Sequence, residues 1–216
     1  MKRELIPRCN RNSPSGCNQK RVFLGLGANV GDKKANIKKA IGYLSENVSD
    51  IKLSPIYETK PWGYEKQDNF LNAAVSGKTS LSPSQLLKFV KDAEKKVGRI
   101  KRFKWGPREI DIDILFYDDL IYKDDDVVIP HPHLHERDFV LKPLMDLDPN
   151  FVHPVFKEKV CELYKALSQK DSSIVCQTRI EMSAFSGTGF KTFSPRMICW
   201  WFPIKLMRCY DNRISF

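Results

Sequence analysis

The order of strand-like and helix-like segments predicts an α+β fold: a ferredoxin-like sandwich in which a mixed β-sheet has helices packed on its faces. Apolar runs typical of strands alternate with amphipathic helical segments in the order β, α, β, β, α, β. Both helices also have recognisable start residues, and several apolar runs end at Gly or Pro. This order is the split βαβ pattern, which specifies that fold.

The first half of the pattern lies before residue 80. Residues 22–27 (VFLGLG) form an apolar run ending in glycine, which predicts a strand, and Asp32 can then cap a helix. A second strand is predicted over residues 51–57. Residues 60–67 contain Pro and Gly and predict a loop, and residues 70–75 are again typical of a strand.

The second half repeats a helix and a strand. Ser82 and Pro83 are typical of a helix start, and Gly98 suits the left-handed residue that ends a helix. Residues 110–117 alternate and then run apolar, as a central strand does, and residues 127–129 predict a short strand that stops at Pro130.

Charge and length restrict the classes of function. The 216 residues carry a formal net charge of +10, but residues 1–20 and 170–216 each hold +4 of it, which leaves +2 for the rest. A basic groove along the body of the fold is therefore not expected, and we predict no nucleic-acid partner. The apolar cluster at residues 197–207 is too short to span a bilayer, so no membrane association is predicted.

The cysteines and the N-terminal sequence indicate a compartment. The six cysteines include no CxxC pair, and the pattern predicts free thiols. The first twenty residues lack the apolar stretch of a secretion signal. Together these features predict a reducing, cytoplasmic location.

Asp111 and Asp113 stand two residues apart in the predicted strand REIDIDIL. Side chains alternate along a strand, so both carboxylates face one side, with Cα atoms roughly 6.6 Å apart at ~3.3 Å per residue. Two like charges are tolerable in water or opposite cations and unfavourable in a dry core. The spacing fits magnesium ions that handle phosphate, although from the spacing alone a solvated strand face is the more common explanation.

Cationic and aromatic residues surround the acidic pair in sequence. Arg108 follows a rigid Gly-Pro turn and can bind phosphate in a bidentate manner. His131 and Arg137 are candidates for phosphate or nucleotide contact. Because no GxxxxGK[ST] loop is present, side chains and metal would have to hold the phosphates. Aromatic side chains that could stack on a flat heterocycle, or simply pack in the core, are Trp62, Phe70, Trp105 and Phe139.

Five segments in this order resemble 6-hydroxymethyl-7,8-dihydropterin pyrophosphokinase, an enzyme of folate biosynthesis: VFLGLGANVGD, ETKPWG, DNFLNAAV, KWGPREIDIDIL and IPHPHLHERDFVLKPL. The resemblance covers residues 21–168 and implies the same ferredoxin-like fold. It also implies a domain organisation with a basic N-terminal extension at residues 1–20, a catalytic domain at residues 21–168 and a C-terminal extension of unknown role at residues 169–216.

The resemblance implies a role for each matching residue. Asp111 and Asp113 would bind two magnesium ions. The catalytic residues would be Arg99, Arg108, Asp111 and Asp113. ATP would be bound by Lys101, Arg102, Lys104, His131 and Arg137, with the loop after Gly98 leaving open which of Lys101 and Arg102 contacts phosphate. The pterin would be bound by Thr59, Trp62, Phe70, Asn72, Trp105 and Phe139.

The activity implied is transfer of pyrophosphate from the co-substrate ATP to the pterin hydroxymethyl group, with release of AMP. The expected partners are these small-molecule substrates, the expected state is a monomer, and association with the next folate-pathway enzyme is a further possibility. Two alternatives stay open: a ferredoxin-like module that binds nucleic acid through its basic tails, and a catalytically dead relative. The first leaves the paired aspartates unexplained.

Overall fold

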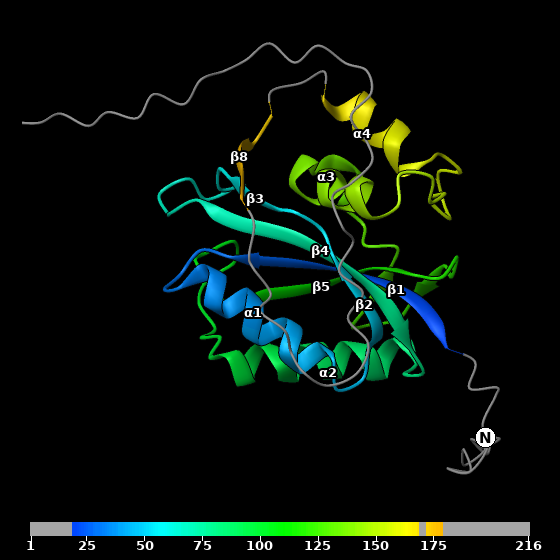
Figure 1. Ribbon diagram of the computed structural model, residues 1–216, viewed down its shortest axis with the longest axis horizontal. Coiled ribbons are helices and arrows are strands. Elements are labelled where there is room, and N and C mark those ends of the chain that lie inside the picture. Colours follow the sequence, from blue (N-terminus) through cyan, green and yellow to red (C-terminus); the bar gives the residue numbers. More distant parts are fainter. Residues whose placement is uncertain (1–18, 169–171, 179–216) are drawn as a thin grey trace, which may run out of the picture.

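A six-stranded β-sheet with helices on both faces organises the protein (Figure 1). The computed structural model describes residues 19–168 and 172–178. The strands of the main sheet are β1 (Lys20–Ala28), β2 (Ser49–Leu53), β3 (Ile56–Thr59), β4 (Phe70–Thr79), β5 (Asp111–Tyr117) and β8 (Ile174–Thr178). Their order is β5-β1-β4-β3-β8, and β2 also pairs with β4. Every pairing among the described strands of this sheet is antiparallel, whereas a mixed sheet was predicted. The predicted α+β sandwich is confirmed.

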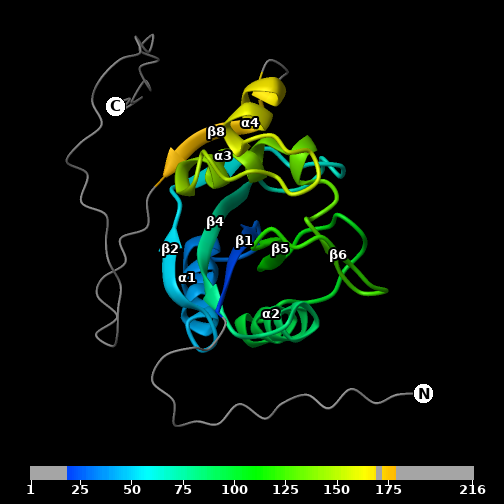
Figure 2. The same ribbon diagram turned by 90° about the vertical axis from the view of Figure 1, so that its right-hand side faces the viewer.

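Two pairs of helices cover the two faces of this sheet. Helices α1 (Lys33–Leu44) and α2 (Pro83–Val97) pack on one face. Helices α3 (Asp138–Leu147) and α4 (Val160–Ser168) pack on the other, as the view turned by 90° shows (Figure 2). None of the helices in the described part of the chain is long and apolar enough to cross a membrane.

The predicted helix ends are present and have the expected hydrogen bonds. The Asp32 side chain accepts a hydrogen bond from Ala35 N at 2.9 Å at the start of α1. At the start of α2, Ser82 and Gln85 bond each other's backbone in a capping box. Gly98 ends α2 with a φ of 111°, a conformation that costs a residue with a Cβ more than it costs glycine.

The larger hydrophobic core lies between the sheet and helices α1 and α2. Alternate residues of β1 and β5 point into it, among them Leu24, Ile112 and Ile114, and the apolar positions of α1 meet them. The opposite face carries a smaller aromatic core, in which Phe23, Phe116 and Phe151 pack with ring centroids 4.6 to 5.9 Å apart. Burial of both faces fixes the register of β5, and so the direction of each of its side chains.

The strand predicted over residues 51–57 is two strands, and that prediction was wrong at its centre. It breaks at Ser54 and Pro55, where proline has no N–H for a ladder. Ser54 is buried there and its hydroxyl accepts a hydrogen bond from Ala74 N at 2.9 Å. The chain therefore moves from β2 to β3 while both remain paired with β4.

The structure also differs from the prediction in the segments after β5. The short strand predicted at residues 127–129 exists as β7 (Val128–Ile129), but it pairs with β6 (Tyr122–Lys123) in a separate two-stranded sheet. Helices α3 and α4 were not predicted. Pro143 inside α3 works against a helical reading, because proline disrupts a helix interior, and tertiary packing on the sheet outweighs that preference here.

Candidate functional site

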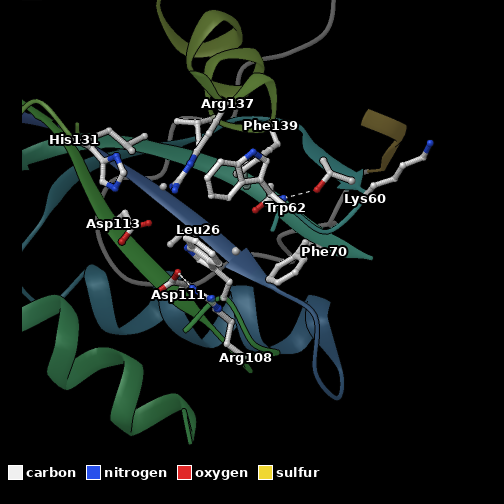
Figure 3. A pocket seen from close by; sticks show the side chains of 18 residues that line it. Leu26, Lys60, Trp62, Phe70, Arg108, Asp111, Asp113, His131, Arg137 and Phe139 are labelled. Atoms are coloured by element: carbon white, nitrogen blue, oxygen red, sulfur yellow. Dashed lines mark hydrogen bonds and ion pairs between the residues drawn. The ribbon is translucent and has the colours of Figure 1, made fainter. Parts of the chain in front are cut away.

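A cleft opens beside β5 and is lined by side chains from β1, β3, β4, β5, α3 and the loops between them (Figure 3). It contains most of the predicted site residues: Thr59, Trp62, Phe70, Asn72, Trp105, Arg108, Asp111, Asp113, His131, Arg137 and Phe139. These residues are spread over eighty positions of sequence, and the antiparallel sheet brings them to one place. Asp111, Asp113 and His131 lie at one side of the cleft and Phe70 and Phe139 at the other, with Arg108 and Arg137 reaching toward the aromatic rings.

Asp111 and Asp113 point to the same face of β5, as the alternation predicts. Ile112 between them is fully buried on the opposite face, whereas both aspartates are only partly buried. Their partners across the sheet in β1 are both glycines, since Gly27 lies opposite Asp111 and Gly25 opposite Asp113. The absence of side chains at these two positions leaves the space beside the carboxylates open to the cleft.

The two carboxylates have different surroundings. Arg99 Nη1 lies 2.6 Å from one oxygen of Asp111, Arg108 Nη1 donates to the other, and Lys91 Nζ lies 4.0 Å away. Burial by itself would raise the pKa of Asp111, but these cations outweigh it and hold the pKa below its usual value. Within the described part of the chain, no hydrogen bond or ion pair engages the Asp113 carboxylate.

Asp113 is correspondingly hard to ionise. Burial, with the nearby charge of Asp111, raises its pKa to about 6. A cation placed beside both carboxylates would lower this pKa and remove their repulsion. The described residues contain no cluster of three or more His, Cys, Asp or Glu able to hold a metal ion. An ion at this pair would therefore draw most of its ligands from water or from a bound anion, as Mg²⁺ commonly does.

His131 and Arg137 form the wall of the cleft that lies opposite Arg108. Burial lowers the pKa of His131 to about 4, helped by the charge of Arg137, so the imidazole is neutral at physiological pH. Its Nδ1 accepts a hydrogen bond from His133 N at 3.2 Å, which leaves the proton on Nε2. Arg137 Nε is buried and has no hydrogen-bond partner in the described part of the chain. Both side chains can donate to an anion in the cleft.

The opposite side of the cleft combines aromatic rings with a buried polar pair. Phe70 stands at the start of β4 and Phe139 in the first turn of α3. Between them, Asn72 donates to the Thr59 hydroxyl at 2.7 Å, and Thr59 is only 1% exposed. The side-chain oxygen of Asn72 lies 2.9 Å from the position that a Cβ would occupy at Gly27. Flat rings with a polar edge fit such a site.

Two loops close over the cleft and contact each other. Trp62 and Trp105 meet edge to face with ring centroids 5.8 Å apart, and both remain more than 40% exposed. Gly63 adopts a φ of 88°, and a Cβ there would lie 3.2 Å from the Trp105 ring. Arg137 lies over the Trp62 ring at 4.8 Å. A ligand under these rings would be shielded from water.

Four predicted residues do not line the cleft. Arg99 reaches it only through Asp111. Arg102 instead pairs with Glu109 at 2.6 Å, and Lys104 lies over the Trp105 ring at 4.7 Å. Lys101 is exposed on the same loop. The ATP-binding role of these three loop residues stays a prediction.

Glu94, a residue not predicted from the sequence, orients the cationic side of the site. Glu94 is 3% exposed, and it accepts hydrogen bonds from Ile112 N at 2.8 Å and from Lys91 Nζ at 2.7 Å. Its other oxygen lies 2.6 Å from Arg99 Nη1. The signal was available, because an acid on the apolar face of a helix is costly to bury unless it has partners.

Asn29 and Gln67 were also missed, and they connect the two loops to β1. Asn29 donates to Gln67 at 3.0 Å and its side-chain oxygen accepts from Arg108 N at 2.8 Å. Gln67 in turn donates to the backbone oxygen of Trp105 at 2.9 Å. No sequence signal marks this network, because its members lie far apart along the chain.

Comparison with known proteins gives three further findings. The profile of the family described as 7,8-dihydro-6-hydroxymethylpterin-pyrophosphokinase matches residues 23–149. The chain is 50% identical to a 2-amino-4-hydroxy-6-hydroxymethyldihydropteridine pyrophosphokinase of Aquifex aeolicus, over 65% of this chain and 88% of that protein. It is 47% identical to the folic acid synthesis protein FOL1 of Dictyostelium discoideum, over 70% of this chain but 23% of that protein.

A solved structure shares the fold. The crystal structure of wild-type HPPK-DHPS from Plasmodium falciparum superposes with a TM-score of 0.56 at 18% identity, over 69% of this chain and 45% of that chain. The chain thus spans less than half of that fused protein. At this level of identity the likeness concerns the sandwich architecture alone.

Proposed function

This chain belongs to the 7,8-dihydro-6-hydroxymethylpterin-pyrophosphokinase family, and on that basis we propose that it transfers pyrophosphate from ATP to 6-hydroxymethyl-7,8-dihydropterin in folate biosynthesis. The observation that carries the proposal is a single cleft in which two carboxylates and several cations face a pair of aromatic rings. The first group suits a metal-bound polyphosphate and the second a flat heterocycle.

Asp111 and Asp113 would hold magnesium. The fit rests on geometry: both carboxylates lie on one face of β5, and within the described residues no hydrogen bond or ion pair engages that of Asp113. A cation there would also offset the unfavourable burial of Asp113 beside Asp111. The small number of protein ligands also agrees with ions that share a substrate's phosphate oxygens. When bound, such ions neutralise charge on the phosphate oxygens and orient the phosphates. The sequence resemblance supports two ions.

Arg108, His131 and Arg137 would hold the triphosphate. The buried Nε of Arg137 lacks a partner that a phosphate oxygen would supply. The neutral His131 offers its Nε2 proton without adding charge. Arg108 is at present bound to Asp111, and a phosphate arriving with a cation would compete for its guanidinium. Arg99 also contacts Asp111, and it would likewise exchange that carboxylate for a phosphate oxygen.

The pterin would lie between Phe70 and Phe139, with its polar edge toward Asn72 and Thr59. The buried hydrogen bond between these two polar residues supports this orientation, because it fixes the amide for recognition of ring nitrogens and oxygens. Trp62 and Trp105 would cover the bound pair and exclude water, which limits hydrolysis of ATP.

The reaction follows from this arrangement. The pterin hydroxyl oxygen forms a bond to the β-phosphorus, the bond between that phosphorus and the oxygen bridging to the α-phosphorus breaks, and AMP leaves. The hydroxyl proton is lost to water or phosphate, since the cleft offers no side chain that is an evident general base. Alignment by Arg108, His131 and Arg137, with charge neutralisation by the two arginines, would supply most of the rate acceleration.

An assay of the nucleotide product tests the proposal. Purified protein with ATP, magnesium and hydroxymethyldihydropterin should form AMP in a 1:1 ratio with pterin pyrophosphate, and none when either the pterin or magnesium is left out. ADP as the sole nucleotide product would contradict pyrophosphoryl transfer, and no product at all would favour the catalytically dead relative. Binding of single-stranded nucleic acid without turnover would favour the other alternative.

We further propose association with the next enzyme of the folate pathway. The fused HPPK-DHPS chain of Plasmodium falciparum supports it, because there the two parts belong to one polypeptide. Co-purification of a tagged chain with that enzyme from a cell extract would test this association.

A further inference from the structure

We propose that the short segment 172–178, which is β8 and the two serines before it, is a positioning element of the pterin cleft, with Asp138 as its anchor. The inference rests on the proposed function, since it concerns the binding of the pterin. The segment lies outside residues 23–149, which the family profile matches. It also lies in the part of the sequence that had been set apart as an extension of unknown role.

The first contact joins the segment to the wall that carries Thr59. β8 pairs antiparallel with β3, and Thr59 lies opposite Ile174 in that pairing (Figure 1). Immediately beyond, Lys60 N donates to Ser173 O at 2.9 Å. Strand β3 has only four residues and would be an edge strand without β8. Pairing on both sides restricts the motion of Thr59, and the bond to Ser173 restricts that of Lys60; both residues line the cleft.

The second contact joins the segment to the opposite wall. Asp138 begins α3 and lies between Arg137 and Phe139, which both line the cleft. Its carboxylate accepts hydrogen bonds from Ser173 N at 2.7 Å, Ser173 Oγ at 2.5 Å and Ser172 Oγ at 3.0 Å. One carboxylate thus receives three hydrogen bonds from two consecutive residues.

Ser173 therefore connects both walls of the pterin cleft through its own backbone. Its N–H donates to Asp138 beside Phe139, and its carbonyl oxygen accepts from Lys60 beside Thr59. The separation between the Phe139 ring and the polar pair of Thr59 and Asn72 is set in part by this residue. A heterocycle that must stack and hydrogen-bond at once is more sensitive to that separation than a triphosphate, which Arg108 and His131 would hold together with Arg137.

Full-length Asp138→Ala and Asp138→Asn compared with the wild type test the inference. Two dissociation constants are measured for each protein by calorimetry: one for hydroxymethyldihydropterin and one for a non-hydrolysable ATP analogue with magnesium. We expect Asp138→Ala to bind the pterin about 10-fold more weakly and the nucleotide within about 2-fold of the wild type. Asp138→Asn keeps an oxygen acceptor for the serines and should recover most of the pterin affinity.

Asp148→Ala is the matched control, because Asp148 caps the other end of the same helix and pairs with Arg21 at 2.7 Å. It should lower the melting temperature without a selective loss of pterin affinity. If Asp138→Ala fails to fold, the double variant Ser172→Ala with Ser173→Ala keeps the carboxylate and removes the two hydroxyl donors, together with the bond that Ser172 Oγ accepts from Ile174 N at 3.2 Å. It should weaken pterin binding about 3-fold.

Unchanged pterin affinity in the folded variants, or an equal loss of pterin and nucleotide affinity, would overturn the positioning role while leaving the proposed function intact. A wild-type protein that binds nucleotide but no pterin would overturn the proposed function itself.

Discussion

Arg99, which follows the Gly98 cap of α2, and Asp111 at the start of β5 are joined by an ion pair with Nη1 and Oδ1 2.6 Å apart. Together with Arg108 this pair lowers the pKa of Asp111, whereas Asp113, two residues further along the same strand face, has its pKa raised to about 6. The pKa values of these two neighbouring carboxylates are thus shifted in opposite directions. Substituting each of them should therefore change the free energy of unfolding in opposite directions.

Asp113→Asn should stabilise the protein and abolish its activity. The pKa in the folded state exceeds the ordinary value of 3.8, so the folded state binds this proton more tightly, and the free energy of unfolding falls as pH rises from about 4 to 6. Removing the charge should raise the free energy of unfolding at pH 7.5 by about 1 to 2 kcal/mol, with no gain at pH 4. If Asp113 holds magnesium as proposed, the variant should also lower kcat at least about 100-fold.

Asp111→Asn provides the contrast. The lowered pKa of Asp111 contributes stability that is present above the ordinary value and is lost as pH falls. This variant should therefore lower the free energy of unfolding at pH 7.5, as measured by urea denaturation. A stabilised Asp111→Asn or a destabilised Asp113→Asn would contradict the assignment of opposite shifts.

Arg108→Lys and Arg102→Lys should differ sharply in turnover. Arg108 lines the cleft, and a lysine cannot reproduce two parallel N–H donors toward a phosphate, so we expect kcat to fall about 100-fold. Arg102 is held by two hydrogen bonds to Glu109, at 2.6 and 3.0 Å, and its replacement should change kcat by less than about 3-fold. Steady-state kinetics at saturating ATP would decide. The reverse ranking would mean that Arg102 leaves Glu109 to bind phosphate.

If Phe70 and Phe139 stack on the pterin as proposed, Phe70→Ala and Phe139→Ala should each raise the KM for the pterin about 10-fold, since loss of a stacking ring removes roughly 1.5 kcal/mol of binding. The KM for ATP should change little. Phe156→Ala is a suitable control, because Phe156 is exposed and packs only near His135 and His153 among the aromatic contacts of the described chain. An unchanged pterin KM in both cleft variants would exclude the sandwich arrangement.

His153 should make the stability of the protein sensitive to acid. It is 3% exposed and its Nδ1 accepts hydrogen bonds from Val155 N and Phe156 N, and burial lowers its pKa to about 4. Because the unfolded chain binds this proton more tightly than the folded one, stability is lost as pH falls from about 6.5 to 4, by about 2 kcal/mol or more.

His153→Asn keeps an acceptor at this turn but does not titrate. Urea denaturation at pH 7.5 and pH 5 should therefore show a smaller difference for the variant than for the wild type. An equal difference in the two proteins would assign the acid sensitivity to other groups.

Much of the site could be predicted because its residues lie in short motifs. The common direction of Asp111 and Asp113 follows from strand periodicity, and the ends of α1 and α2 follow from capping residues. The break at Ser54 and Pro55 was missed although a proline within residues 51–57 is a local signal against one continuous strand. Helix α3 was missed because Pro143 opposes it locally, although its apolar face packs on β4.

The sequence by itself determined which chemical groups are present and how each is oriented on its own element, since alternation along a strand and capping of a helix depend only on near neighbours. Only the tertiary structure decided that Gly25 and Gly27 lie opposite the two aspartates, that Glu94 holds Arg99, and that Ser173 bridges Asp138 and Lys60. These relations join residues far apart in the chain, and they arise from strand register and packing, which no local pattern encodes.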